Sequence, residues 1–166
     1  MFLPDGSEYL CPICKDGLLE FRDYVKRIQR HEGGDAEWIK IPRHQCTNPS
    51  CRKIHRMLPD ILVPFKHYQE SVVVDAIDDR IDPKTCDEQP SIQTVKRWKH
   101  WMIINELDID GQLKSIGHLE LGFSPELLKS SISLLGKLRS SIPEGWLKMI
   151  LRIIYNAGAR LSAVYI

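Results

Sequence analysis

The sequence predicts an α+β protein in which an N-terminal zinc ribbon is followed by an all-α helical bundle. Two closely spaced cysteine pairs, Cys11/Cys14 and Cys46/Cys51, flank a stretch rich in strand-forming residues, an arrangement typical of a ribbon. After residue 68 the apolar residues recur at three- and four-residue spacing, which predicts helices. We therefore place the ribbon in residues 1–64 and the helical domain in residues 65–166, a division that suits a chain of 166 residues.

The paired cysteines are the predicted ligands of one Zn²⁺ ion. Cys11 and Cys14 form a CxxC turn, which holds two sulfurs close enough to share a cation, and the Asn48-Pro49 dipeptide favours a second turn between Cys46 and Cys51. Four thiolates at about 2.3 Å close the zinc tetrahedron, so the site organises a fold and does no chemistry. Two disulfides and a redox CxxC are the alternatives, although an intracellular chain rarely keeps disulfides and no βαβ pattern surrounds the CxxC. His55 could also replace a cysteine as a ligand.

Between the cysteine pairs the sequence predicts a β-hairpin. Its turn is expected at Glu32-Gly33-Gly34-Asp35, because the two glycines tolerate positive φ. A third short strand is expected over residues 54–58, after the second cysteine pair. Since a ribbon of this size has little core of its own, the metal ion replaces buried apolar area.

A proline-containing segment, HRMLPDILVPFKHY over residues 55–68, connects the ribbon to the helices and cannot itself be helical. On three features the chain resembles a bacterial family of uncharacterised proteins, many of them close to mobile elements. These features are the CPxC pair, a second cysteine pair followed by His55, and a block like LPDxLVPxKHY. The resemblance covers about residues 9–102 and implies a zinc ribbon joined to a helical DNA-binding unit. The family usually has two residues between the second pair of cysteines, where this chain has four.

Residues 68–105 predict a helix-turn-helix-like segment. The first helix is expected from Tyr68 to about Asp79, and the second from an N-cap at Ser91 to about Asn105. The polar connection between them holds Cys86, most simply a free thiol. A DNA-binding helix must pack on its partner while it offers donors to the major groove. The packing side of the second helix is expected to consist of Val95, Trp98, Met102 and Asn105.

The polar side of this second helix is the predicted DNA contact. Gln93 and Thr94 stand at its N-terminal end, where side chains can reach base edges. The bases Lys96, Arg97, Lys99 and His100 would face the phosphates. A second contact is expected from ribbon residues Arg43, Arg52 and Lys53. The alternative interpretation is a surface helix and a strand face whose charges are simply solvated.

Two further helices are expected in the last third of the chain. One starts at Ser124-Pro125-Glu126, with proline at the first helical position, and continues to Leu138. The other follows a capping box, Ser141-Ile142-Pro143-Glu144, and ends near Gly158. Both are expected to pack on the earlier helices. The alternative is that the C-terminal helices and the apolar tail LSAVYI contact a second copy in a homodimer or a protein partner.

No catalytic residue set is recognisable, so we expect that the chain is not an enzyme. Its only acidic cluster, Asp75, Asp78, Asp79 and Asp82, is expected to be the solvated face of one helix. Asp75, Asp78 and Asp79 are therefore expected to be dispensable for function. A glycine-rich phosphate loop and a nucleophile elbow are both missing from the sequence.

The function predicted from these patterns is that of a zinc-ribbon DNA-binding protein, a regulator or an accessory factor of a transposon or phage. The alternative is a zinc-stabilised protein-protein interaction module with a helical dimerisation domain. No apolar run reaches the length of a membrane span, and the first ten residues lack the features of a signal peptide. We therefore expect no membrane contact and a cytoplasmic location.

Overall fold

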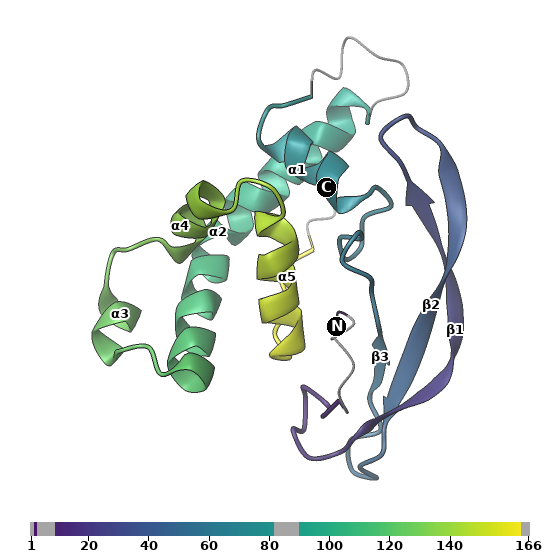
Figure 1. Cartoon of the computed structure of the whole chain (residues 1–166), viewed down its shortest axis with the longest axis vertical. Coiled ribbons are helices and arrows are strands. Elements are labelled where there is room, and N and C mark those ends of the chain that lie inside the picture. Colours follow the sequence, from purple (N-terminus) through teal and green to yellow (C-terminus); the bar gives the residue numbers. More distant parts are fainter. Residues whose placement is uncertain (1, 3–8, 82–89, 164–166) are drawn as a thin grey trace.

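The computed structural model describes residues 2, 9–81 and 90–163, and over these residues it is an α+β structure, as predicted. A three-stranded antiparallel sheet comes first and five helices follow it (Figure 1). The strands are β1 (Leu19–Arg30), β2 (Ala36–Cys46) and β3 (Ile54–Arg56). The helices are α1 (Glu70–Ile77), α2 (Ile92–Leu121), α3 (Pro125–Lys129), α4 (Leu134–Ser141) and α5 (Trp146–Asn156).

The predicted hairpin and third strand are confirmed. The sheet has the order β1-β2-β3, and in the hairpin Lys26 lies opposite Lys40 and Ile28 opposite Trp38. The turn between β1 and β2 contains Gly34 with a φ of 82°, which is the reason for a glycine there. In Figure 1 the hairpin is a long curved ribbon that runs beside the helices, with β3 on its inner edge.

The segment between β3 and α1 is non-helical, as its prolines require. Leu62 and Val63 are fully buried, whereas Phe65 is 65% exposed. The Arg27 guanidinium on β1 donates one hydrogen bond to the Val63 carbonyl at 2.6 Å and another to the Lys66 carbonyl. One strand side chain therefore holds both ends of the turn that carries Phe65.

The second helix is longer than predicted. It does not end near Asn105 but continues to Gly122, whose φ of 70° closes it. The buried stripe that the sequence indicated is present, and Ile109 and Leu113 extend it beyond Asn105. The Asn105 carboxamide is satisfied without ending the helix, because it donates to the Trp101 carbonyl at 2.8 Å and accepts from the Ser162 N–H at 2.8 Å. The helix-turn-helix stays a prediction, and its connection with Cys86 lies outside the described residues.

The last third of the chain differs from the prediction in its helix boundaries. The helix expected from Ser124 to Leu138 is divided into α3 and α4, because the Ser133 hydroxyl accepts from the Gly136 N–H at 2.9 Å and starts a new helix. The predicted capping box is wrong as well. Ser141 is the last residue of α4, and α5 starts after Gly145, which has a φ of 86°.

One apolar core joins the sheet to the helices. Ile41 of β2 and Leu58 of the connection belong to the same buried cluster as Trp146 and Ile150 of α5. An ion pair also joins the helices to the connection after β3, since Arg152 of α5 lies 2.8 Å from Asp60. The boundary between residues 64 and 65 stays a prediction, but the packing is continuous across it. None of the helices formed by the described residues is both long and apolar enough to cross a membrane.

Candidate metal centre

The four paired cysteines form one compact cluster. Their sulfur atoms all lie within 4.8 Å of one another, with 3.8 Å between Cys11 and Cys51 and 3.6 Å between Cys14 and Cys46. A tetrahedron of thiolates at about 2.3 Å from a metal has edges of about 3.8 Å. A disulfide would need about 2.05 Å, and all four thiols are free. The cluster therefore has the dimensions of a four-thiolate site and could hold a metal ion.

Both cysteine pairs lie on turns that end in the same way. The residue directly after each second cysteine, Lys15 or Arg52, has a left-handed backbone with a φ of 56° or 50°. In the first turn the Lys15 N–H donates to the Cys11 carbonyl at 2.8 Å, and in the second the Arg52 N–H donates to the Asn48 carbonyl at 3.0 Å. Asn48 also accepts from the Ser50 N–H at 2.9 Å. The extra residues of the second pair are therefore absorbed by an Asn-initiated turn.

Two glycines that the sequence analysis did not assign to the site allow close approaches around it. A Cβ atom on Gly17 would lie 2.5 Å from the Cys46 sulfur, so only glycine fits between the two turns. A Cβ atom on Gly158 would lie 2.4 Å from the Pro12 carbonyl oxygen, so the end of the helical part packs on the first cysteine turn. Neither role is visible in the sequence, because the partner of each glycine is distant along the chain.

The thiols of the cluster ionise at different pH values. Backbone N–H groups, first that of Gly17, lower the pKa of Cys14 to about 6. Burial raises the pKa of Cys46 to about 12. At neutral pH the protein alone therefore does not supply four thiolates. A bound cation would provide the charge that deprotonates the remaining sulfurs, which couples metal binding to proton release.

His55 is a hydrogen-bond partner of the cluster and does not belong to it. Its Nε2 lies 3.4 Å from the Cys11 sulfur, and the group of four mutually close ligands contains cysteines alone. Burial lowers the pKa of His55, which favours the neutral ring. A neutral imidazole can donate its N–H to a thiolate and so orient it, as residues behind metal ligands commonly do.

The predicted DNA contacts fall into two groups that the fold does not bring together. Those on the second helix lie at the start of α2, and in Figure 1 this end of α2 is opposite to the cysteine turns. At the start of α2 the side chains of Gln93, Lys96, Arg97 and His100 are exposed. Near the second cysteine turn Arg52 and Lys53 are exposed.

Three of the predicted DNA contacts have partners within the protein. Lys99 forms an ion pair with Asp79 of the turn after α1. Arg43 forms two hydrogen bonds of 2.5 Å with the Asp23 carboxylate on β1. The Thr94 hydroxyl shares a hydrogen bond of 3.0 Å with the Ser91 hydroxyl, so Thr94 belongs to the helix cap.

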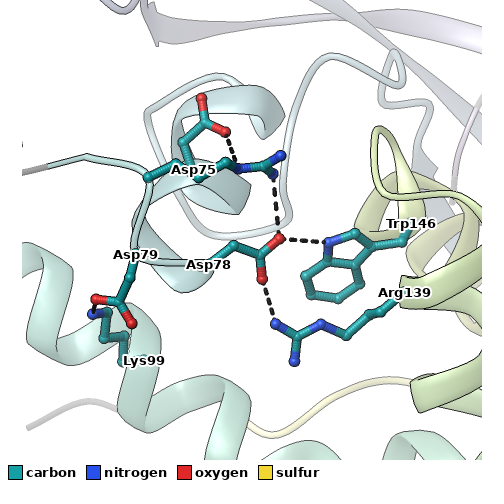
Figure 2. A network of polar contacts seen from close by, with 7 residues as sticks. Asp75, Asp78, Asp79, Lys99, Arg139 and Trp146 are labelled. Atoms are coloured by element: carbon teal, nitrogen blue, oxygen red, sulfur yellow. Dashed lines mark hydrogen bonds and ion pairs between the residues drawn. The ribbon is translucent and has the colours of Figure 1, made fainter.

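Within the acidic cluster, Asp78 does not lie on a solvated helix face, which corrects the prediction for this residue. Figure 2 shows the Asp78 carboxylate between the ends of two other helices, with Arg139 of α4 and Trp146 of α5 pointing toward it. The Trp146 N–H donates to it at 3.1 Å, and Arg80 lies 3.2 Å away. Its side chain is only 20% exposed. Asp82, the fourth acid of the predicted cluster, lies outside the described residues.

Together these features define an α+β protein with a four-cysteine site that could hold a metal ion. The model of one family, described as "Domain of unknown function (DUF6431)", matches residues 11–98, and the chain belongs to this family. The match starts at the first cysteine of the cluster and ends within α2, so it includes the complete sheet and all four cysteines of the cluster. The predicted membership of an uncharacterised family is confirmed, whereas the link to mobile elements stays a prediction. No curated protein and no solved structure matches the chain.

Proposed function

We propose that this chain is a zinc-binding, DNA-binding protein that acts as a regulator or as an accessory factor of a mobile element. The observation that carries this proposal is the exposed polar and basic surface at the start of α2, made of Gln93, Lys96, Arg97 and His100. No described carboxylate forms an ion pair with Lys96 or Arg97. Such a surface attracts the phosphates of a polyanion.

Zinc is the metal that best suits the cluster. Thiolate ligands select soft or borderline cations, and a tetrahedral set of four cysteines that leaves no open position is typical of structural Zn²⁺. The role of the ion here is to hold the two cysteine turns together at one end of the sheet. Elemental analysis of protein purified without chelator tests this assignment, and it should give one zinc per chain.

The ion pairs of Lys99 and Arg43 reduce the set of residues offered to DNA. Neither side chain is free to contact phosphate unless it gives up a carboxylate within the protein. The proposal therefore rests on Lys96 and Arg97, with Gln93 placed to contact bases. Arg52 and Lys53 are exposed at the other end of the molecule, so they would reach DNA only as a separate contact.

The test is a titration of labelled duplex DNA, followed by fluorescence anisotropy over a series of salt concentrations. Lys96→Ala and Arg97→Ala should each weaken binding and reduce the slope of log affinity against log salt by about 0.9. Lys129→Ala is the matched control, because Lys129 is an exposed lysine on α3. Gln93→Ala should relax sequence preference by roughly 1–3 kcal/mol. If the double variant Lys96→Ala/Arg97→Ala binds like the parent at every salt concentration, the start of α2 is only a protein surface.

A second candidate function is dimerisation or protein docking, favoured by exposed apolar residues on α2. Leu107 is 87% exposed and Ile103, one turn before it, is 67% exposed. An apolar contact would depend little on salt. Light scattering tests it, since Leu107→Ser should shift a concentration-dependent dimer to the monomer.

We also propose that the chain is not an enzyme. The acids at the end of α1 are engaged by cations of the protein, with Asp75 paired to Arg80 at 2.8 Å and Asp79 paired to Lys99. A magnesium-dependent nuclease activity that Asp75→Ala abolishes would contradict this proposal.

A further inference from the structure

Two neighbouring cavities lie between the sheet and the helices, and together they are called the groove. The larger, of about 670 Å³, lies between the β1–β2 hairpin and the connection that follows β3. The smaller, of about 280 Å³, lies between the same connection and the first turns of α2. They share Pro64, Phe65, His67 and Tyr155 as lining residues. The groove defined by these two cavities thus extends from the hairpin, past Phe65, to Arg97 on α2.

The charged residues that line the groove are all cationic. Lys26, Arg56 and Arg160 line its larger part, and Arg97 lines its smaller part. None of these four residues forms an ion pair with a carboxylate of the described residues, and no Asp or Glu is among the residues that line either cavity. Burial and the positive charge of Arg56 lower the pKa of Arg27, so the like charges act on one another. This mutual repulsion is relieved when an anion enters the groove.

Exposed aromatic rings line the groove together with these cations. Phe65 is 65% exposed and lines both cavities, while Trp38 is 68% exposed and lines the larger one. Phe65 also has a left-handed backbone with a φ of 63°, a conformation that a bulky residue rarely adopts. The two hydrogen bonds from Arg27 to the carbonyls of Val63 and Lys66 hold the turn in this shape. The fold thus maintains an unfavourable backbone conformation that keeps an apolar ring at the surface.

We propose that the groove binds single-stranded polynucleotide, with bases stacked on Phe65 and Trp38 and phosphates paired with Lys26, Arg56, Arg97 and Arg160. A cationic groove and exposed aromatic rings are the two features by which proteins hold single strands, because every base has a face that can stack and every linkage carries a negative charge. In a duplex the faces of the bases are already stacked on each other. The rings of the groove would then have no partner.

This inference deepens the proposed nucleic-acid binding and rests on it, but it concerns other residues. The residues proposed to contact duplex DNA are Gln93, Lys96, Arg97 and His100. Of these, Arg97 alone lines the groove. Variants of Phe65, Trp38, Lys26 and Arg56 therefore test the groove, and Lys96→Ala tests the surface of α2.

The experiment compares three labelled probes by fluorescence anisotropy with the full chain in its metal-bound form: oligothymidylate, oligouridylate and a duplex. Phe65→Ala and Trp38→Ala should each weaken single-strand binding about tenfold, as expected when one stacked base is lost. Arg56→Ala should reduce the salt slope by about 0.7. None of these variants should change duplex binding. The two single-stranded probes distinguish DNA from RNA as the strand that is bound.

Two of these variants, at Phe65 and Lys26, have a matched control at a neighbouring position. Ile61 is 49% exposed in the same connection as Phe65 but does not line the groove, so Ile61→Ala should bind like the parent. Lys40 lies directly opposite Lys26 in the hairpin and does not line the groove either, so Lys26→Ala should weaken binding and Lys40→Ala should not. Circular dichroism of every variant verifies that it is folded.

The groove proposal is overturned if single strands bind no better to the parent than to Phe65→Ala and Trp38→Ala. Duplex binding that is lost on Lys96→Ala would then leave the proposed function intact. If no probe binds the parent, both proposals are wrong. A crosslink from halogenated oligouridylate to the peptide that carries Trp38 or Phe65 would support the groove by a measurement independent of affinity, and a crosslink confined to other peptides would contradict it.

Discussion

Replacing Asp78 should destabilise the protein more than replacing its neighbour Asp79, because Asp78 connects three helices. Its carboxylate accepts from the Trp146 N–H at 3.1 Å and pairs with Arg139. In Asp78→Ala the fully buried Trp146 keeps an N–H without an acceptor, which costs about 1–3 kcal/mol. Loss of the Arg139 pair adds about 1 kcal/mol, discounted because that side chain is 38% exposed. We expect the free energy of unfolding to fall by about 3 kcal/mol.

The comparison between variants makes this prediction specific. Asp79 has the same charge and also forms an ion pair, but its side chain is 80% exposed, so Asp79→Ala should cost about 0.5 kcal/mol or less. Asp78→Asn keeps an acceptor for the Trp146 N–H and loses only the charge, so it should fall between the two at about 1 kcal/mol. Figure 2 shows why the two carboxylates differ: Asp78 faces the other helices, whereas Asp79 faces Lys99 at the edge.

These differences are measured by urea unfolding of the metal-bound protein. Unfolding is monitored by tryptophan fluorescence and by far-ultraviolet circular dichroism. The two probes should give coincident transitions, since two-state behaviour is needed for the free energies to be compared. If Asp78→Ala and Asp79→Ala unfold within about 0.5 kcal/mol of each other, the network around Asp78 does not stabilise the fold and our reasoning is refuted.

Three further predictions concern the metal centre and a partly buried lysine, Lys66. Gly17→Ala should displace the Cys46 sulfur and weaken zinc binding in a chelator competition. Gly111→Ala, which has nothing within 4 Å of its new methyl group, should bind zinc normally. Equal zinc affinities of the two variants would contradict the close approach of Gly17 to Cys46. Chelation, or Cys11→Ser, should lower the melting temperature of sheet and helices together because the core is continuous; two separate transitions would contradict this. Burial lowers the pKa of Lys66 from 10.5 to about 8, so the unfolded chain binds more protons between these pH values and the free energy of unfolding should rise there by about 3 kcal/mol. Urea titrations at several pH values measure this rise, and Lys66→Met should remove it. If the pH dependence of the free energy of unfolding is the same in Lys66→Met as in the parent, the rise belongs to other groups.

Features that depend on short stretches of chain were predictable from the sequence. The cysteine spacing indicated the four-cysteine cluster, and the glycines at 33–34 indicated the hairpin turn, because a turn is specified by the few residues that form it. The stripe from Val95 to Asn105 was identified correctly for a similar reason, since helical spacing alone decides which residues share a face. The alternation of polar and apolar residues does not mark where a helix ends, and the end of α2 was therefore placed too early.

Whether a charged residue is free or paired was decided by the tertiary structure. In the sequence Lys99 has no acid within the segment from Gln89 to Met102, yet Asp79 reaches it from the turn after α1. Asp78 was expected to be solvated. Its partners Arg139 and Trp146 lie far from it along the chain, so no local sequence pattern indicated them. The strength of an ion pair depends on distance and burial in space, and neither can be read from local sequence.

The sequence by itself determined the α+β class, the hairpin, the paired cysteines and the buried side of α2, since each of these follows from spacing within a few turns of chain. The groove was decided by tertiary structure alone. Lys26, Arg56 and Arg160 come from β1, from β3 and from the chain after α5, and no sequence pattern relates them. They line one cavity because one apolar core contains residues of the hairpin, of the connection after β3 and of α5, and burial of that core stabilises the arrangement of these cations.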